Sequence, residues 1–195
     1  IETPSFSSEE DQTALLIENW FTQNNIPFER ENNNVWAFNK HFDKNKPTLL
    51  LNSHHDTVKP NQGYTNDPFK AIVDDGKLYG LGSNDAGGCL VSLLATFVHF
   101  YSNENLPYNL VMVASAEEES SGKNGLNSVL KHLPELEKIF NKYFIYPEDL
   151  DKWIPFLDFR ITIYYLTLPF VINYFLPNTI FTATLRYCFL FNKRR

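Results

Sequence analysis

Two apolar segments of strand length, each ending abruptly in coordinating side chains, place the strongest constraint on how this chain can fold. Residues 49–58 read LLLNSHHDTV, and residues 108–119 read YNLVMVASAEEE. Continuous apolar runs of this length are typical of strands buried in a parallel sheet. In open α/β sheets, functional sites lie beyond the carboxyl ends of the strands. The sequence therefore predicts a functional site where these two segments end.

The rest of the chain up to about residue 136 alternates between helix and strand patterns. Ser7-x-x-Glu10 reads as a capping box that opens a helix. Beyond it, hydrophobic periodicity predicts a further strand at residues 33–38 and two helices, at residues 89–100 and 124–133. The apolar run at 48–52 (TLLLN) is expected to be buried on both faces. This alternation predicts an α/β fold, a layered αβα sheet domain.

Charge and cysteine usage argue against several classes of partner. The formal net charge of -6 argues against a nucleic-acid partner, because phosphate binding needs clustered Lys and Arg. The two cysteines, Cys89 and Cys188, form no disulfide framework and favour a reducing compartment. The first residues lack the basic and apolar regions of a secretory signal. We therefore expect a cytoplasmic protein without a membrane or nucleic-acid partner.

The first candidate site follows the apolar run of residues 49–52. Side chains alternate faces along a strand, so His54 and Asp56 share one face and His55 points away. A metal-binding histidine usually gives its second ring nitrogen to a carboxylate, which fixes its tautomer. His54 and Asp56 therefore suit a metal ligand and its neighbouring carboxylate. A polar strand end with capping residues is the alternative.

The second candidate, Asp85, lies in the glycine-rich segment 80–88 (GLGSNDAGG), just before the predicted helix 89–100. An aspartate there is well suited to cap the helix N-terminus, and this is the plainer interpretation. A phosphate cradle is disfavoured, because the segment matches neither phosphate-binding fingerprint and its acidic residue repels phosphate. A metal ligand is the third possibility.

The third candidate is the run Glu117-Glu118-Glu119 after the second apolar strand. A charge run of this kind is commonly a solvated turn. Like charges side by side are nevertheless unfavourable unless a cation compensates them. The run offers both a metal ligand and a general base, and the local pattern leaves open which glutamate has which role.

The order of these three candidates along the chain resembles the zinc metallopeptidase and deacylase family that includes acetylornithine deacetylase, succinyl-diaminopimelate desuccinylase, aminoacylase and glutamate carboxypeptidase. Segment 53–60 (SHHDTVKP) is similar to the family's His-x-Asp-x-Val-x-Pro element, 79–88 (YGLGSNDAGG) to Gly-x-Gly-x-x-Asp-x-x-Gly, and 117–122 (EEESSG) to acidic-Glu-Glu-x-x-Gly. The residues of the first two segments are most similar to those of acetylornithine deacetylase. The similarity runs from about residue 3 to residue 137.

The resemblance implies a role for each candidate. His54 would bind the first zinc ion, oriented by Asp56. Asp85 would bridge two zinc ions, Glu118 would be the general base, and Glu119 would bind the second ion. Cobalt is a possible substitute for zinc. Two such cations polarise an amide carbonyl and share a hydroxide, while the carboxylate transfers the proton.

The implied activity is hydrolysis of the amide bond of a small N-acyl amino acid, with N-acetylornithine as the first choice and arginine biosynthesis as its setting. A related dipeptidase or desuccinylase is one alternative. A non-catalytic or membrane-tethered remnant is the other. Members of the family form homodimers through an inserted dimerisation domain.

The segment 138–195 departs from the family pattern. No glycine follows Gly125, no histidine follows His132, and residues 161–185 carry no charge. Two of the family's five metal-ligand positions and its dimerisation domain are therefore expected to be absent, so weak activity or none is expected of this chain. A shifted reading frame after about residue 137 is the preferred explanation, and a membrane-inserted tail is the alternative. Residues 1–137 would then be the N-terminal part of the catalytic domain.

Overall fold

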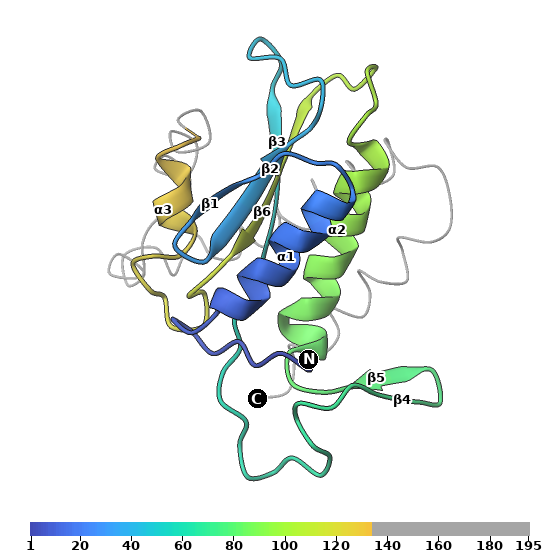
Figure 1. Ribbon diagram of the computed structural model, residues 1–195, viewed down its shortest axis with the longest axis vertical. Coiled ribbons are helices and arrows are strands. Elements are labelled where there is room, and N and C mark those ends of the chain that lie inside the picture. Colours follow the sequence, from blue (N-terminus) through green and yellow to red (C-terminus); the bar gives the residue numbers. More distant parts are fainter. Residues whose placement is uncertain (134–195) are drawn as a thin grey trace, which may run out of the picture. The chain divides into compact units, whose positions relative to one another are not determined.

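A computed structural model describes residues 1–133 of the chain. Figure 1 shows the arrangement of its helices and strands. In chain order they are α1 (Asp11–Gln23), β1 (Glu29–Glu31), β2 (Asn34–Phe38), β3 (Thr48–His54), β4 (Ile72–Asp74), β5 (Lys77–Tyr79), the short helical segment η1 (Ser83–Gly88), α2 (Cys89–Phe100), β6 (Asn109–Ser115) and α3 (Leu126–Leu130). The predicted helix at residues 89–100 and the predicted strand at residues 33–38 are both confirmed.

The main sheet has four strands in the order β1-β2-β6-β3. The strand pairs β1–β2 and β2–β6 are antiparallel, whereas β3 and β6 are parallel. Their register pairs His54, the last residue of β3, with Ser115, the last residue of β6. Because parallel strands end at the same edge of a sheet, the segments that follow β3 and β6 start side by side.

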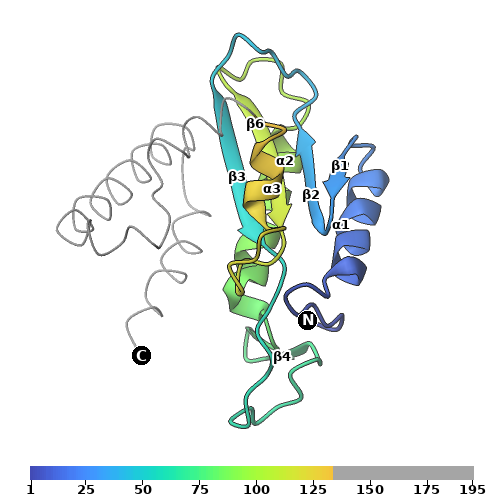
Figure 2. The ribbon, with the colours of Figure 1, turned by 90° about the vertical axis from the view of Figure 1, so that its left-hand side faces the viewer.

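Helices cover both faces of this sheet, which confirms the predicted layered α/β arrangement. The larger core lies between the sheet and the helices α1 and α2, where Phe21 and Phe97 are fully buried. Each such side chain contributes about 1.5–3 kcal/mol to folding through burial. On the opposite face, α3 packs through buried Val129, and His132 stacks on Trp36 of β2 at 5.3 Å between ring centroids. Figure 2 shows α3 in front of the strands and α2 behind them.

The predicted capping box at the start of α1 is wrong. No side chain caps α1, which begins at Asp11. The Ser7 hydroxyl donates instead to Asp56, 49 residues away in sequence. The Glu10 carboxylate accepts one bond from the nearby Ser8 amide, but it also accepts bonds from distant segments. Tertiary hydrogen bonds have thus replaced the local ones that the spacing of these residues suggests.

The expectation that the run 48–52 is buried on both faces is also wrong for the part of the chain that the structure describes. Within residues 1–133, β3 pairs with β6 alone and forms an edge of the sheet, and its Leu49 is 39% exposed. Of the two inner strands, β2 and β6, the second is buried at every position. The apolar run therefore predicts a strand here, but it does not predict that the strand lies in the interior of the sheet.

The predicted boundary at residue 137, the tail 138–195 and the uncharged stretch 161–185 all lie outside the described residues. Within residues 1–133, no helix has both the length and the apolar character that a membrane span requires.

Candidate metal centre

A closed glycine turn presents Asp85 beside the end of β3. Gly82 adopts a left-handed backbone with φ of +72°, and its carbonyl oxygen accepts a hydrogen bond from the Gly87 amide at 2.8 Å. A Cβ atom at Gly87 would lie 2.5 Å from that same oxygen, so the turn closes only around a glycine. Asp85 is 78% exposed. Helix α2 has Gly88 at its N-cap position and no side-chain cap hydrogen bond, so Asp85 is not the helix cap that the plainer interpretation expected.

Three of the candidate residues, His54, Asp85 and Glu119, come together at the carboxyl ends of β3 and β6; they are called the triad below. One donor atom from each lies within 4.8 Å of the others. The shortest approach joins His54 Nε2 to Asp85 Oδ1 at 3.2 Å. Glu118 lies beside the triad, with its Oε2 3.6 Å from His54 Nε2. Segments separated by up to 65 residues of sequence therefore supply a single cluster.

Glu117, the first glutamate of the acidic run, faces away from the triad. The Glu117 carboxylate accepts hydrogen bonds from the backbone and side-chain amides of Asn124 at 3.2 and 2.9 Å. These bonds, chiefly the one from the side chain, lower the pKa of Glu117. The structure thus separates the three residues: Glu118 and Glu119 lie at the triad, and Glu117 holds the loop that follows.

Asp56 lies behind the triad and is fully buried. Its Oδ1 lies 3.3 Å from His54 Nδ1 and accepts the Glu118 amide at 3.1 Å. Its Oδ2 accepts the Glu119 amide at 3.0 Å and the Ser7 hydroxyl at 2.6 Å. His54 Nδ1 also lies 3.0 Å from the backbone carbonyl of Asp56, so an Nδ1–H tautomer leaves Nε2 facing the triad. This is the hydrogen-bonding pattern of a metal-binding histidine.

His55 points away from the triad, as strand alternation predicts. Its ring nitrogens lie 2.9 Å from the Thr13 hydroxyl and 2.8 Å from the Asn33 carbonyl. Burial lowers the pKa of His55. A buried, neutral histidine with both nitrogens engaged fixes the end of β3 against α1 and the start of β2.

The charges around the triad are unbalanced without a cation. Burial raises the pKa of Glu119, and the negative charges of Asp85 and Glu118 raise it further. A bound cation reverses this penalty, because it favours the ionised carboxylates. One imidazole nitrogen with carboxylate oxygens is a donor set that suits zinc. The residues present therefore fit a metal ion of this type.

The His54–Asp56 pair predicts how the stability of the metal-free chain depends on pH. Burial disfavours the charged imidazole, but the Asp56 hydrogen bond and the charges of Glu118 and Asp56 outweigh it and raise the pKa of His54 from 6.5 to about 9. The stabilisation from the charged pair is then complete below pH 6.5. It is lost as the pH rises through about 9, with an expected loss of about 2–3 kcal/mol.

Urea denaturation at pH 6 and pH 9.5 in the presence of a chelator measures this loss. His54→Gln is the control, because it removes the titrating ring and should abolish most of the difference. At the acid end, burial is outweighed by the hydrogen bonds from His54, Ser7 and the amides of Glu119 and Glu118, which lower the pKa of Asp56 to about 2. Its contribution should therefore be complete above pH 3.8 and be lost as the pH falls from there through about 2. An equal free energy of unfolding at pH 6 and at pH 9.5 would contradict the charged pair of His54 and Asp56.

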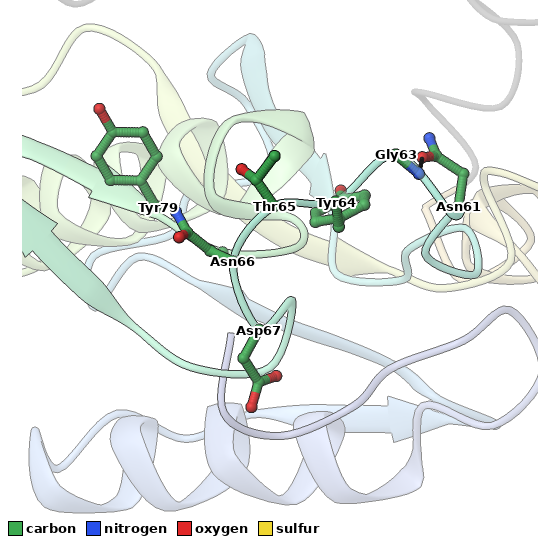
Figure 3. Close-up of a pocket in the computed structure, with 8 residues that line it drawn as sticks. Asn61, Gly63, Tyr64, Thr65, Asn66, Asp67 and Tyr79 are labelled. Carbon is green, nitrogen blue, oxygen red and sulfur yellow. Dashed lines mark hydrogen bonds between the residues drawn. The ribbon is translucent and has the colours of Figure 1, made fainter.

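A separate cavity of about 280 Å³ is lined by the loop after β3 and by the end of β5. Its walls carry mostly uncharged hydrogen-bonding groups, from Asn61, Gly63, Tyr64, Thr65, Asn66, Asp67, Tyr79 and Gly80. Figure 3 shows these residues, with the Asp67 carboxylate and the Tyr79 ring on different sides of the loop. No member of the triad lines this cavity, so the candidate metal centre and the cavity are distinct features of the described residues.

Sequence reasoning missed Ser7 and Glu10 as contributors to the site. Ser7 donates to Asp56, and Glu10 accepts from the Glu117 amide at 3.1 Å. The only sequence signal at these positions was the Ser-x-x-Glu spacing, which has a local explanation in helix capping. A fully buried glutamate beside a strongly polar N-terminal segment becomes recognisable only once the chain is folded.

The sequence model of Peptidase family M20/M25/M40 matches residues 50–166. The match extends beyond residue 137, where the motif resemblance ends. A succinyl-diaminopimelate desuccinylase of Helicobacter pylori (strain P12) is 34% identical over 98 residues, which are 49% of this chain and 25% of that protein. A cysteinylglycine-S-conjugate dipeptidase of Corynebacterium striatum is 36% identical over 93 residues, 46% of this chain and 20% of that protein. The chain thus spans a quarter or less of these curated relatives.

Among solved structures, an M20 family metallo-carboxypeptidase from Sulfolobus solfataricus is similar in fold, with a TM-score of 0.56. It is 22% identical in sequence, and the similarity covers 67% of this chain and 32% of the other. These two curated relatives are a desuccinylase and a dipeptidase, whereas the residues of the motifs predict a deacetylase.

Proposed function

Because this chain belongs to Peptidase family M20/M25/M40, we propose that it forms the N-terminal part of the catalytic domain of a metal-dependent amidohydrolase. The observation that carries the proposal is the triad: His54, Asp85 and Glu119 offer one donor atom each within 4.8 Å, with Glu118 beside them. The reaction is hydrolysis of an amide bond in a small N-acyl amino acid or peptide.

Each residue has a distinct part in this proposal. His54 and Glu119 would each hold one zinc ion and Asp85 would be a ligand of both, with cobalt as a substitute for zinc. Bound zinc supplies a Lewis acid and lowers the pKa of water to roughly 7. Glu118 takes the proton of the attacking water and passes it to the leaving amine. Asp56 holds the His54 ring and the Glu118 and Glu119 amides in place.

The substrate that we propose is an N-succinylated diamino acid. The support is the desuccinylase similarity, at 34% identity over 98 residues of this chain. N-acetylornithine, which the wording of the motifs suggested, becomes the less favoured substrate because no relative described above is a deacetylase. A dipeptide is the second candidate, since the dipeptidase relative is 36% identical over a similar length.

The test is a panel of three substrates offered to the full chain with excess zinc or cobalt: N-succinyl-diaminopimelate, N-acetylornithine and a cysteinylglycine conjugate. We expect the succinyl substrate to give the highest kcat/KM. The absolute rate should be low, because only three of the family's five ligand positions are recognised in the sequence. A higher kcat/KM for N-acetylornithine would instead favour deacetylation of that substrate. Hydrolysis of the cysteinylglycine conjugate alone, with release of glycine, would favour the dipeptidase.

The shifted reading frame after about residue 137 stays a prediction. Sequencing the gene from the codon for Asn127 onward, with translation in all three frames, tests it. A second frame that contains a Gly-Glu-Pro element and a later histidine would support it. The same tail in an independently determined copy of the gene would count against it.

A further inference from the structure

Two buried carboxylates hold three successive backbone amides of the loop that carries Glu118 and Glu119. The Glu117 amide donates to Glu10, and the next two amides donate to Asp56. Both carboxylates are fully buried. The acidic loop, defined as residues 117–122, is therefore fixed at its backbone from two different parts of the chain.

Glu10 has no role in metal binding that its geometry supports, yet its burial demands an explanation. Burying a carboxylate is strongly unfavourable unless hydrogen bonds satisfy it. Glu10 Oε1 accepts from the Ser8 amide at 2.7 Å and from the Glu117 amide at 3.1 Å. Its Oε2 accepts from Asn33 Nδ2 at 2.8 Å. One carboxylate thus joins the N-terminal segment, the start of β2 and the end of β6.

The hydrogen bond from the Glu117 amide to Glu10 lies where it can affect the geometry of the triad. Glu117 has φ of +52°, a left-handed conformation that is uncommon for a residue with a side chain. Such a conformation persists where the surroundings fix it. Here Glu10 holds the backbone amide of Glu117, and Asn124 holds its carboxylate. This residue sets the direction in which the chain leaves β6, directly before Glu118 and Glu119.

We propose that Glu10 is a positioning residue that directs Glu118 and Glu119 towards His54 and Asp85 by fixing the backbone of Glu117. The inference rests on the metal site of the proposed function and assigns to it a residue from the N-terminal segment. Glu10 acts through the backbone, without touching metal or substrate. Loss of its carboxylate should therefore alter metal binding more than the loss of fold stability explains.

The experiment compares four variants of the full chain with the wild type. Glu10→Gln removes the charge and keeps the size, and Glu10→Asp keeps the charge but shortens the reach. Glu9→Gln is the matched control, because Glu9 is exposed and adjacent and loses the same charge. Glu119→Gln is the reference for loss of a ligand. The measurements are zinc affinity by competition with a chelator, the visible spectrum of bound Co²⁺, and the metal-free melting temperature.

We expect both Glu10 variants to weaken zinc binding by about 10–100-fold and to change the Co²⁺ spectrum, as removal of groups that orient metal ligands does elsewhere. Glu9→Gln should match the wild type. Wild-type affinity and an unchanged spectrum in folded Glu10 variants would overturn the proposal and leave Glu10 a stabilising residue only. If neither variant folds, Asn33→Ala, which removes one donor to Glu10, must weaken zinc binding more than Glu9→Gln does.

The reference variant separates this inference from the proposed function. Weak binding by Glu119→Gln with normal binding by the Glu10 variants overturns only the positioning role. Normal binding by Glu119→Gln, or no zinc binding by the wild type, overturns the metal site itself and the positioning role with it.

Discussion

Replacing Asp56 with alanine is expected to lower the free energy of unfolding of the metal-free chain by about 3–5 kcal/mol and to abolish zinc binding at the triad. The Asp56 carboxylate is fully buried and lies against four donors: His54 Nδ1, the Ser7 hydroxyl and the amides of Glu118 and Glu119. Truncation leaves these donors without an acceptor and removes the charge that favours protonated His54. Glu118 and Glu119 also lose the bonds that hold their backbone.

Urea denaturation with a chelator present gives the change in stability, and metal analysis after dialysis against zinc gives the loss of binding. Asp74→Ala is the matched control, because Asp74 is exposed on β4 and should change neither quantity by much. A loss of less than 1 kcal/mol in Asp56→Ala would show that the buried network contributes little. Normal zinc binding by this variant would contradict the role of Asp56 in orienting His54.

Replacing Glu118 with glutamine is expected to lower kcat by about 10²–10⁴-fold while zinc stays bound. Glu118 lies beside the triad, with its carboxylate 59% exposed and 3.6 Å from His54 Nε2. An exposed carboxylate next to a metal site is accessible to water and to the leaving amine. Glutamine keeps the size of the side chain and removes its ability to accept a proton. The fold should be unaffected, because no described hydrogen bond depends on the Glu118 carboxylate other than its approach to His54.

The measurement is turnover of the best substrate of the panel, with zinc content determined on the same samples. Glu104→Gln is the control, since Glu104 is exposed and pairs only with His41 among the described residues. Loss of both turnover and zinc in Glu118→Gln would identify Glu118 as a ligand. Unchanged turnover would move the general base to another residue, for which Glu119 is the nearest candidate.

The sequence predicted where the candidate site lies because the periodicity of the strands is a local property. His54 and Asp56 end one apolar run, Glu118 and Glu119 follow another, and parallel strands bring such ends together. The sequence could not sort Glu117 from its two neighbours. That difference depends on a left-handed backbone at Glu117 and on Asn124, and neither leaves a pattern in the charge run.

The roles of Ser7 and Glu10 show a second limit. Their spacing agrees with a helix cap, and local propensity alone supports that interpretation. The tertiary structure uses both groups differently, because Asp56 and the Glu117 amide lie within reach only after β3 and β6 have packed beside α1. The edge position of β3 among the described residues was likewise not readable, since an apolar run predicts a strand but not its neighbours.

The parallel register of β3 and β6 has a kinetic consequence. Strands that pair in parallel across a long stretch of chain close a large loop, and contacts of high sequence separation form slowly. A slip of one residue along β6 would also turn His54 to the opposite face of the sheet, away from Glu119. Competence to bind zinc therefore requires the correct register, so it should develop only in the last and slowest phase of folding. The ion would act as a reporter of completed folding rather than as its nucleus.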